Sequence, residues 1–225
     1  MKFFITGDSR GLGNSLCNNF AKDYEVVGIS RKDIDDCVWN HISCDLSQKT
    51  VSKEIEEELK NTDVLIHNAA IASSNLSLVE TLSHGEKVFD VNFFTPFILT
   101  KTWLKYRIGK KKPGQVIFIS SICSKKTFKG LGMYAASKAA INSFSKTIAT
   151  EMGSRGIRSN VVLPGYMETD MSASLTDNQL EKIRSRSPMK RLATLDEVVK
   201  AVQFLATEST YNNGSEIVID GGYIL

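Results

Sequence analysis

Short apolar runs recur along the chain and alternate with longer amphipathic stretches. Runs of this kind are typical of strands buried on both faces, and the stretches between them are typical of helices. The expected strands are residues 2–6, 25–30, 41–44, 63–67, 115–120, 158–163 and 216–220. Strands that alternate with helices predict an α/β fold, a Rossmann-type doubly wound parallel sheet of about seven strands with helices on both faces.

The expected helices are residues 14–22, 51–59, 76–107, 134–152 and 195–206, the third interrupted near Asn92 and Pro96. Since no repeat or linker divides the chain, we expect one domain over residues 1–225. Residues 166–190 are polar and weakly periodic. They predict either a lid on the substrate side of the sheet or a helical excursion at the surface.

Composition excludes several classes of function. The net charge of +3 is too small to indicate a nucleic-acid partner, and no apolar run approaches the roughly 18 residues that a membrane span needs. The opening residues pass directly into a glycine-rich stretch, so we expect no signal peptide. The 4 cysteines form no C-x-x-C pair and the 3 histidines do not cluster, which indicates reduced thiols in a cytoplasm and no metal site.

A glycine-rich turn follows the first expected strand and precedes a helix. Glycines let the backbone approach a pyrophosphate, and the helix N-terminus supplies free amides. Such glycines also serve ordinary turns, but the strand-turn-helix context favours a dinucleotide site. The candidate cofactor contacts in this turn are Gly7, Ser9, Arg10, Gly11, Leu12 and Gly13.

Cations follow the second expected strand, where a site that prefers NAD has an acid. Arg31 and Lys32 stand there, and Arg10 lies in the glycine-rich turn. This favours NADP(H), with its 2′-phosphate, over the alternative of a solvated basic pair. Asp45 and Leu46 follow the third strand, where Asp45 is expected to accept from an adenine amino group, to cap the next helix, or to do both.

Polar or small residues also follow the fourth and fifth strands. Asn68, Ala69 and Ala70 leave room for another group to come close, and Ser121 follows a strand on the edge where parallel sheets bind ligands. Asn92 lies among apolar neighbours, so it is either a satisfied core amide or a group that holds a water.

A basic run ends the long third helix. It predicts either a solvated helix end or a landing patch for an acidic partner. Its members are Lys105, Arg107, Lys110, Lys111 and Lys112.

Tyr134 and Lys138 lie four residues apart, which places both side chains on one face of a helix. A nearby cation favours the phenolate and lowers the pKa of a tyrosine, so that the phenol can exchange a proton with a substrate oxygen. The same spacing occurs on many surface helices. The signals elsewhere in the chain decide between these interpretations.

Four signals occur in order: the turn at residues 6–13, Asn68 to Ala70, Ser121, and Tyr134-x-x-x-Lys138. Together they resemble the short-chain dehydrogenase/reductase family over essentially the whole chain. Residues 154–157, 160–162, 164–171 and 221–222 add a similarity to the 3-oxoacyl-acyl-carrier-protein reductases within it.

The resemblance implies a role for each matching residue. Tyr134 would protonate the ketone oxygen, Lys138 would hold the nicotinamide ribose and lower the pKa of Tyr134, and Ser121 would bind the same carbonyl. Asn92 would anchor a water in the proton relay. The residues implied around the nicotinamide are Pro164, Gly165, Met167 and Thr169.

The resemblance also implies the reaction: NADPH-dependent reduction of a 3-oxoacyl thioester on acyl carrier protein to the 3-hydroxyacyl form. Lys112 and Arg155 match basic residues that dock the acidic carrier, and the family implies a homo-oligomer, a tetramer or dimer with the Tyr134 helix at an interface. Two alternatives remain open. One is a dehydrogenase of a free alcohol, sugar or steroid, and the other is a non-catalytic NADP sensor or scaffold, which would not need Ser121, Tyr134 and Lys138 together.

The chain departs from the family pattern in two places. Ala70 stands where the family has glycine, which requires a negative φ at that residue. The stretch from Gly13 to Asp45 is shorter than in typical members of the family, so we expect the helix between the second and third strands to be reduced to a loop.

Overall fold

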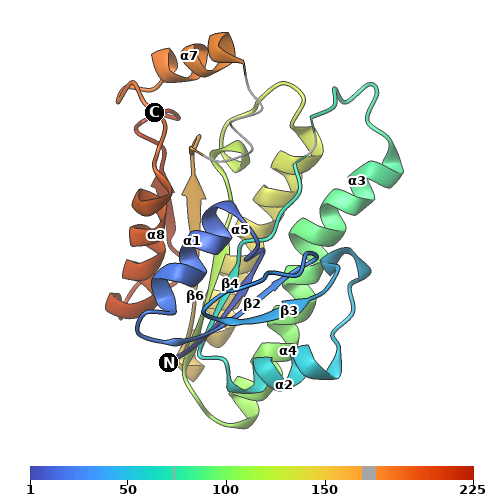
Figure 1. The fold of residues 1–225 in the computed structure, drawn as a ribbon, viewed down its shortest axis with the longest axis vertical. Coiled ribbons are helices and arrows are strands. Elements are labelled where there is room, and N and C mark those ends of the chain that lie inside the picture. Colours follow the sequence, from blue (N-terminus) through green and yellow to red (C-terminus); the bar gives the residue numbers. More distant parts are fainter. Residues whose placement is uncertain (73, 169–175) are drawn as a thin grey trace.

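The computed structural model describes residues 1–72, 74–168 and 176–225. Its centre is a parallel sheet of seven strands, as the sequence predicts (Figure 1). The strand order is β3-β2-β1-β4-β5-β6-β7. The strands are β1 (Lys2–Thr6), β2 (Glu25–Ser30), β3 (Asn40–Ser43), β4 (Val64–His67), β5 (Gly114–Ile119), β6 (Ile157–Pro164) and β7 (Glu216–Ile219).

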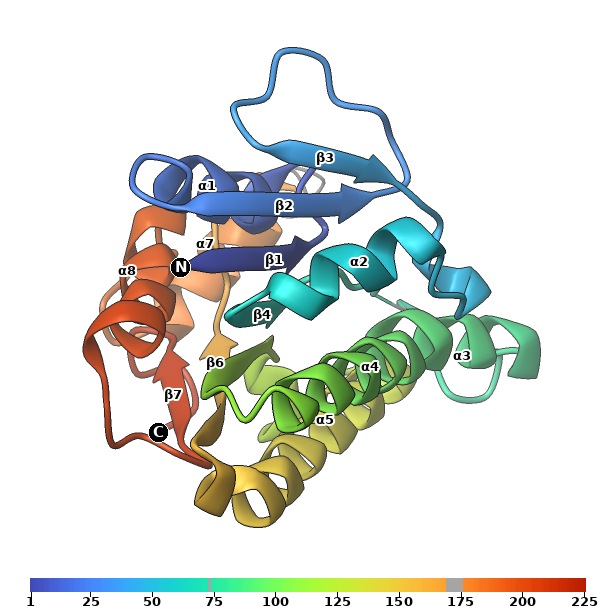
Figure 2. The same cartoon turned by 90° about the horizontal axis from the view of Figure 1, so that it is seen from below.

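Helices cover both faces of the sheet (Figure 2). On one face α1 (Gly11–Phe20) and α8 (Leu195–Gln203) pack on a core that includes Phe3 and Val162. On the other face α2 (Lys53–Asn61), α4 (Thr95–Gly109) and α5 (Gly132–Met152) enclose a second core around Trp103 and Phe118. These two cores explain why the strands read as continuous apolar runs.

The strand order reverses beside β1. The chain starts in the middle of the sheet, runs outward to β3, and returns to the other side of β1 with β4. Connections therefore leave the carboxyl ends of β1 and β4 in opposite directions, and the crevice between them is where open α/β sheets bind ligands.

The connection between β2 and β3 contains no helix, as expected, and residues 31–39 form a loop (Figure 2). The long helix expected over residues 76–107 is divided. Helix α3 spans Leu82–Phe89, a π-helical turn (η2) spans Asp90–Phe94, and α4 follows. The interruption expected near Asn92 is this π-helical turn, a feature that often marks functional sites.

Short 3₁₀ and π-helical turns complete the described chain: η1 (Leu46–Gln48), η3 (Ile122–Ser124), η4 (Gly153–Arg155) and η5 (Phe204–Glu208). Within residues 166–190, α7 (Asp177–Arg186) lies beyond the carboxyl edge of the sheet (Figure 1). It has no buried residue, which fits a helical surface excursion. In the described ranges, no helix has the length and apolar character of a membrane span.

Candidate active site

The glycine-rich turn forms an open cradle at the carboxyl end of β1. Gly7 has a φ of +80°, and a Cβ on Gly13 would lie 1.9 Å from the Gly7 carbonyl oxygen, so these glycines are required by close backbone approach. Nothing lies within 4 Å of the position that a Cβ on Gly11 would take. Arg10 precedes α1 without a side-chain cap, which leaves the first amides of the helix open to a ligand. The turn therefore fits a pyrophosphate.

Asn68 fastens this cradle to the end of β4. Its backbone amide and that of Ala69 donate to Thr6 Oγ1, each at 3.0 Å, and its side-chain Nδ2 donates to the carbonyl oxygens of Thr6 (3.0 Å) and Gly7 (3.2 Å). Ala70 is not among the described residues with positive φ, so its backbone meets the condition set by the departure from glycine.

Cations lie exposed where the adenosine side of the site is expected. Arg10, Arg31 and Lys32 are exposed. Asp45 Oδ1 accepts from the Ser47 amide at 3.0 Å, and this bond, helped by the charges of Arg31 and Lys87, lowers the pKa of Asp45. Asp45 therefore caps the short 3₁₀ turn η1, whereas the N-cap of the next helix, α2, is Ser52, so the expected capping of that helix by Asp45 is wrong.

Two of the predicted contacts can face a cofactor only through their backbone. The side chains of Leu12 and Leu46 lie in the two cores. Ser9 keeps a partly exposed side chain on the turn.

Ser121, Tyr134 and Lys138 meet at the carboxyl end of β5. Ser121 is the N-cap of η3, its Oγ accepts from the Cys123 amide at 3.2 Å, and its hydroxyl also hydrogen-bonds the Tyr134 side chain. The Lys138 Nζ donates to the Ile119 carbonyl oxygen at 2.7 Å and lies 5.8 Å from the centre of the Tyr134 ring. The three groups that the sequence selected therefore form one site.

The expected effect on Tyr134 is corrected by the structure. Removal of its hydroxyl from water raises the pKa of Tyr134, with a smaller contribution from Cys123, and the hydrogen bond with Ser121 opposes the rise only in part. In the chain alone, the ammonium of Lys138 does not produce the predicted lowering, because burial disfavours the phenolate. A protonated phenol is the form that a general acid needs.

Burial also governs the two basic groups behind Tyr134. It lowers the pKa of Lys138 to about 8, opposed by Cys123, and lowers the pKa of His67 to about 3, with Lys138 as the second cause. His67 lies with its Nε2 2.8 Å from Thr100 Oγ1 and its ring stacked on Phe118. A neutral His67 adds no second charge next to Lys138.

Asn92 is a satisfied amide, which was the first of its two expected roles. Its Oδ1 accepts from the Ile71 amide at 2.9 Å, and its Nδ2 donates to the Ile71 carbonyl oxygen (2.9 Å) and to Ser137 Oγ (3.0 Å). Ser137 in turn donates to the Tyr134 carbonyl oxygen at 2.7 Å. The π-helical turn therefore supports the first turn of α5, and the water-holding role stays a prediction.

The expected nicotinamide side lies where β6 ends. Pro164 is the last residue of the strand, the Gly165 amide donates to the Ile219 carbonyl oxygen at 2.8 Å, and Met167 forms a bridge with Ala193. Thr169 lies outside the described residues.

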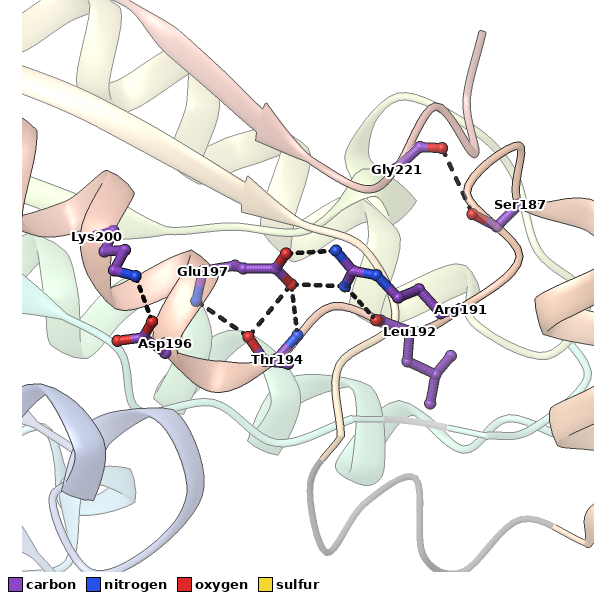
Figure 3. Close-up of polar contacts among 8 residues, drawn as sticks. All are labelled: Ser187, Arg191, Leu192, Thr194, Asp196, Glu197, Lys200 and Gly221. Carbon is purple, nitrogen blue, oxygen red and sulfur yellow. Dashed lines mark hydrogen bonds and ion pairs between the residues drawn. The ribbon is translucent and has the colours of Figure 1, made fainter.

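Ala193, the partner of Met167, directly precedes Thr194, the N-cap of α8. Figure 3 shows the polar contacts around that N-cap. Arg191 pairs with both carboxylate oxygens of Glu197, and Glu197 forms a capping box with Thr194. These contacts fix residues 191–197, so the bridge at Ala193 gives Met167 a defined place at the carboxyl edge.

Lys112 and Arg155 lie at the opposite edge of the sheet. They precede the first residues of β5 and β6, which are paired through Gly114 and Ile157. Both are exposed, and β5 separates Lys112 from Ser121 by roughly 20 Å at 3.3 Å per residue. The basic run is not uniformly solvated, because Arg107 is buried and bonds Asp63 and the Pro113 carbonyl oxygen.

Three features of the site were not predicted from the sequence. Ser137 joins Asn92 to α5, and its signal is a small polar residue on the inner face of the helix. The Cys123 thiol lies near Tyr134 and Lys138, and burial raises its pKa. The rings of Phe128, Tyr166 and Tyr223 form an aromatic cluster beside them, which only the fold brings together. Over the described part of the chain, no group of His, Cys, Asp or Glu could hold a metal ion.

Comparison with known proteins agrees with this geometry. A family model described as enoyl-(acyl carrier protein) reductase matches residues 27–224. A 3-oxoacyl-[acyl-carrier-protein] reductase of Salmonella typhimurium is 32% identical and covers 97% of this chain and 95% of its own. Carbonyl reductase family member 4 of Xenopus laevis is 34% identical with the same coverage.

Solved structures extend the likeness to dehydrogenases of small molecules. One, described as an NAD(P)-dependent gluconate 5-dehydrogenase from Beutenbergia cavernae with bound NADP, is 25% identical with a TM-score of 0.92, covering 99% of this chain and 96% of its own. A 4-hydroxyisoleucine dehydrogenase complexed with NADH and succinate has the same identity and a TM-score of 0.88, and the match covers 99% of both chains.

Proposed function

The chain belongs to the short-chain dehydrogenase/reductase family, and we propose that it uses NADPH to reduce a 3-oxoacyl thioester on acyl carrier protein to the 3-hydroxyacyl form. As a member it is an oxidoreductase that acts on CH–OH groups with a nicotinamide cofactor. The observation that carries the proposal is the meeting of Ser121, Tyr134 and Lys138 at the carboxyl edge, next to the open cradle at Gly7–Gly13.

The proposed chemistry assigns each side chain a task. A bound nicotinamide supplies the hydride that reduces the carbonyl carbon. Ser121 and Tyr134 donate hydrogen bonds to the carbonyl oxygen and stabilise the charge that develops on it. Tyr134 then gives up its proton to that oxygen, and the adjacent Lys138 ammonium stabilises the resulting phenolate. Asn92 and Ser137 hold the first turn of α5 so that the phenol stays in line.

Preference for NADPH is supported by charge. Arg10, Arg31 and Lys32 are exposed around the adenosine side of the crevice. In the place that an acid takes in sites that prefer NAD, a cation instead attracts the 2′-phosphate.

A thioester with an apolar acyl chain is supported by the aromatic cluster. Phe128, Tyr166 and Tyr223 pack together, with centroids 5.3–6.2 Å apart, next to Cys123 and the catalytic groups. Lys126 lies over the Tyr223 ring and donates to the Tyr223 carbonyl oxygen, so its ammonium already has partners within the cluster. Such a wall suits an acyl chain better than a polyol.

Carrier docking on Lys112 and Arg155 implies an assembly of copies. A carrier bound to these residues would face away from the catalytic edge of the same chain, so we propose that it serves the site of a second copy. Phe94 and Phe97 expose 44% and 39% of their surfaces on η2 and α4, which supports a homo-oligomer, a dimer or tetramer, formed through these helices.

A second candidate substrate is a free hydroxy acid or sugar acid, because the gluconate dehydrogenase structure has a high TM-score. The test is a panel measured with NADPH: acetoacetyl thioester, its carrier-bound form, 5-ketogluconate and simple ketones. Reduction of the thioesters with at least about tenfold higher kcat/KM supports the proposal, and preference for the keto acid replaces it. Tight cofactor binding without turnover on any carbonyl would contradict both.

A further inference from the structure

A buried carboxylate lies beneath the phosphate cradle. Asp8, within the glycine-rich turn, is 0% exposed. Its Oδ2 accepts from Trp39 Nε1 at 2.9 Å and lies 2.6 Å from His41 Nδ1, which donates to it. A Cβ on Gly28 would lie 2.1 Å from the same oxygen, so glycine in β2 is what makes room for the carboxylate.

These contacts join elements on both sides of the adenosine crevice. Asp8 belongs to the turn after β1, His41 to β3, and Trp39 ends the loop of residues 31–39 that begins with Arg31. The Gly7 amide also donates to the Ile29 carbonyl oxygen at 2.7 Å, which holds the turn to the end of β2. The Asp8 carboxylate therefore joins the phosphate turn to Trp39, at the end of the loop of residues 31–39. The same loop begins with Arg31, the predicted contact of the 2′-phosphate.

The loop depends on such an anchor because it has no helix of its own. Val38 and the residues 31–33 are exposed, whereas Trp39 is buried in the core under α1. Within the loop, Cys37 Sγ contacts the Trp39 carbonyl oxygen at 3.2 Å. Arg31 follows the last residue of β2, and its carbonyl oxygen accepts from Ser43 Oγ of β3 at 3.5 Å. The start of the loop is therefore held by the pairing of β2 with β3, and its end is held by Trp39.

The buried Asp8 carboxylate lowers the stability of the fold. Asp8 Oδ1 and His41 Nε2 are buried without a hydrogen-bond partner in the described structure. A buried charge with an unsatisfied oxygen destabilises a fold, and apolar residues of the same volume would avoid that cost. The two hydrogen bonds to one oxygen are directional, and they fix the position of the glycine-rich turn relative to the start of β3.

We propose that Asp8, acting through Trp39 and His41, is a positioning residue for the adenosine half of the dinucleotide. It holds the loop of residues 31–39 at a set distance from the phosphate turn, so that Arg31 and the turn contact one ligand together. The inference rests on the proposed function only in requiring a nicotinamide dinucleotide in this crevice.

The test breaks each contact separately in the full-length chain. Trp39→Phe removes the Nε1–H donor and keeps an aromatic ring, and His41→Leu removes the Nδ1 donor. The matched control is His41→Asn, which places an amide donor where Nδ1 stands. Dissociation constants are measured by titration for NADPH, for adenosine 2′,5′-bisphosphate and for nicotinamide mononucleotide, and melting is followed by circular dichroism to show that each variant is folded.

The expected result is a split between the two halves of the cofactor. Trp39→Phe and His41→Leu weaken the binding of NADPH and of the adenosine bisphosphate by about five- to tenfold and leave the affinity for the mononucleotide unchanged. His41→Asn keeps the affinity for NADPH and for the adenosine bisphosphate within about twofold of the wild type. Two results overturn the inference: unchanged binding of the adenosine bisphosphate in both variants, or an equal loss of affinity for the adenosine bisphosphate and for the mononucleotide. Either result would show that Asp8, Trp39 and His41 have a structural role only. Failure of the wild-type chain to bind any dinucleotide would instead remove the proposed function itself.

Discussion

Tyr134 and Lys138 lie one helical turn apart on α5, and the Lys138 Nζ stands 5.8 Å from the centre of the Tyr134 ring while it donates to the Ile119 carbonyl oxygen. The ammonium is therefore held by the end of β5 and not by the phenol. Burial pushes both groups toward their neutral forms, since it raises the pKa of Tyr134 and lowers that of Lys138 to about 8. At neutral pH the site therefore holds Tyr134 as a protonated phenol and Lys138 as a buried ammonium, and the burial of that ammonium lowers the stability of the fold.

Lys138→Met should stabilise the chain while it impairs catalysis. Because the pKa of Lys138 is lowered to about 8 from 10.5, the unfolded state binds more protons than the folded state between these values, and the wild type gains stability as pH rises through that window. The advantage of the variant should therefore shrink by about 2 kcal/mol between about pH 7 and about pH 9.5.

Urea unfolding at the two pH values measures this difference. Lys101→Met, at an exposed position of α4, is the matched control and should show no such change. A Lys138→Met variant that is less stable than the wild type by a constant amount at both pH values would show that the lysine is not held at a cost.

His67 should make the fold sensitive to acid. Burial lowers the pKa of His67 to about 3. Between about pH 6.5 and pH 3 the imidazole is therefore protonated in the unfolded state and neutral in the folded state, so the stability of the fold falls as the pH falls. At about pH 5 this single group should cost about 2 kcal/mol relative to neutral pH. His67→Asn should remove that part of the acid destabilisation in parallel unfolding curves, and identical pH dependence in both proteins would contradict the buried neutral imidazole.

Arg10→Ala combined with Arg31→Ala should reduce the affinity for NADPH much more than for NADH. If two charge-assisted hydrogen bonds to the 2′-phosphate are lost, the difference is about 2–4 kcal/mol. Calorimetric titration with both cofactors checks it, with Lys22→Ala past the end of α1 as the control for net charge. Equal losses for the two cofactors would defeat the preference for NADP.

Charge reversal at Lys112 and Arg155 should slow reduction of a carrier-bound substrate and spare a small thioester analogue. Both residues lie at the amino edge of the sheet, remote from Ser121, so the change does not reach the catalytic groups of the same chain. The measurement is kcat/KM for the two substrates, with Lys101→Glu as the control. If both substrates respond alike, these residues are not a docking site.

Sequence patterns predicted the elements because both faces of this sheet are covered and its strands are apolar throughout. They also located Ser121, Tyr134 and Lys138, since each follows a strand end or shares a helix face at short separation. The Asp8 cluster was out of reach, because its partners Trp39 and His41 are 31 and 33 residues away and carry no common motif.

The effect of burial on charged and titratable groups could not be predicted from the sequence either. The direction of the Tyr134 pKa was predicted wrongly because a sequence shows the neighbouring cation but not the loss of water, which here is the larger effect. Arg107 shows the same limit, since its place in a basic run hid a buried contact with Asp63.

The most direct test of the central claim compares Tyr134→Phe with the wild type in NADPH oxidation by acetoacetyl thioester. Loss of a general acid should lower kcat by about 10²- to 10⁴-fold, and because the ring remains in place, the dissociation constant for NADPH should stay within about twofold. Turnover by the phenylalanine variant at the wild-type rate would show that the Tyr134 hydroxyl takes no part in the reaction.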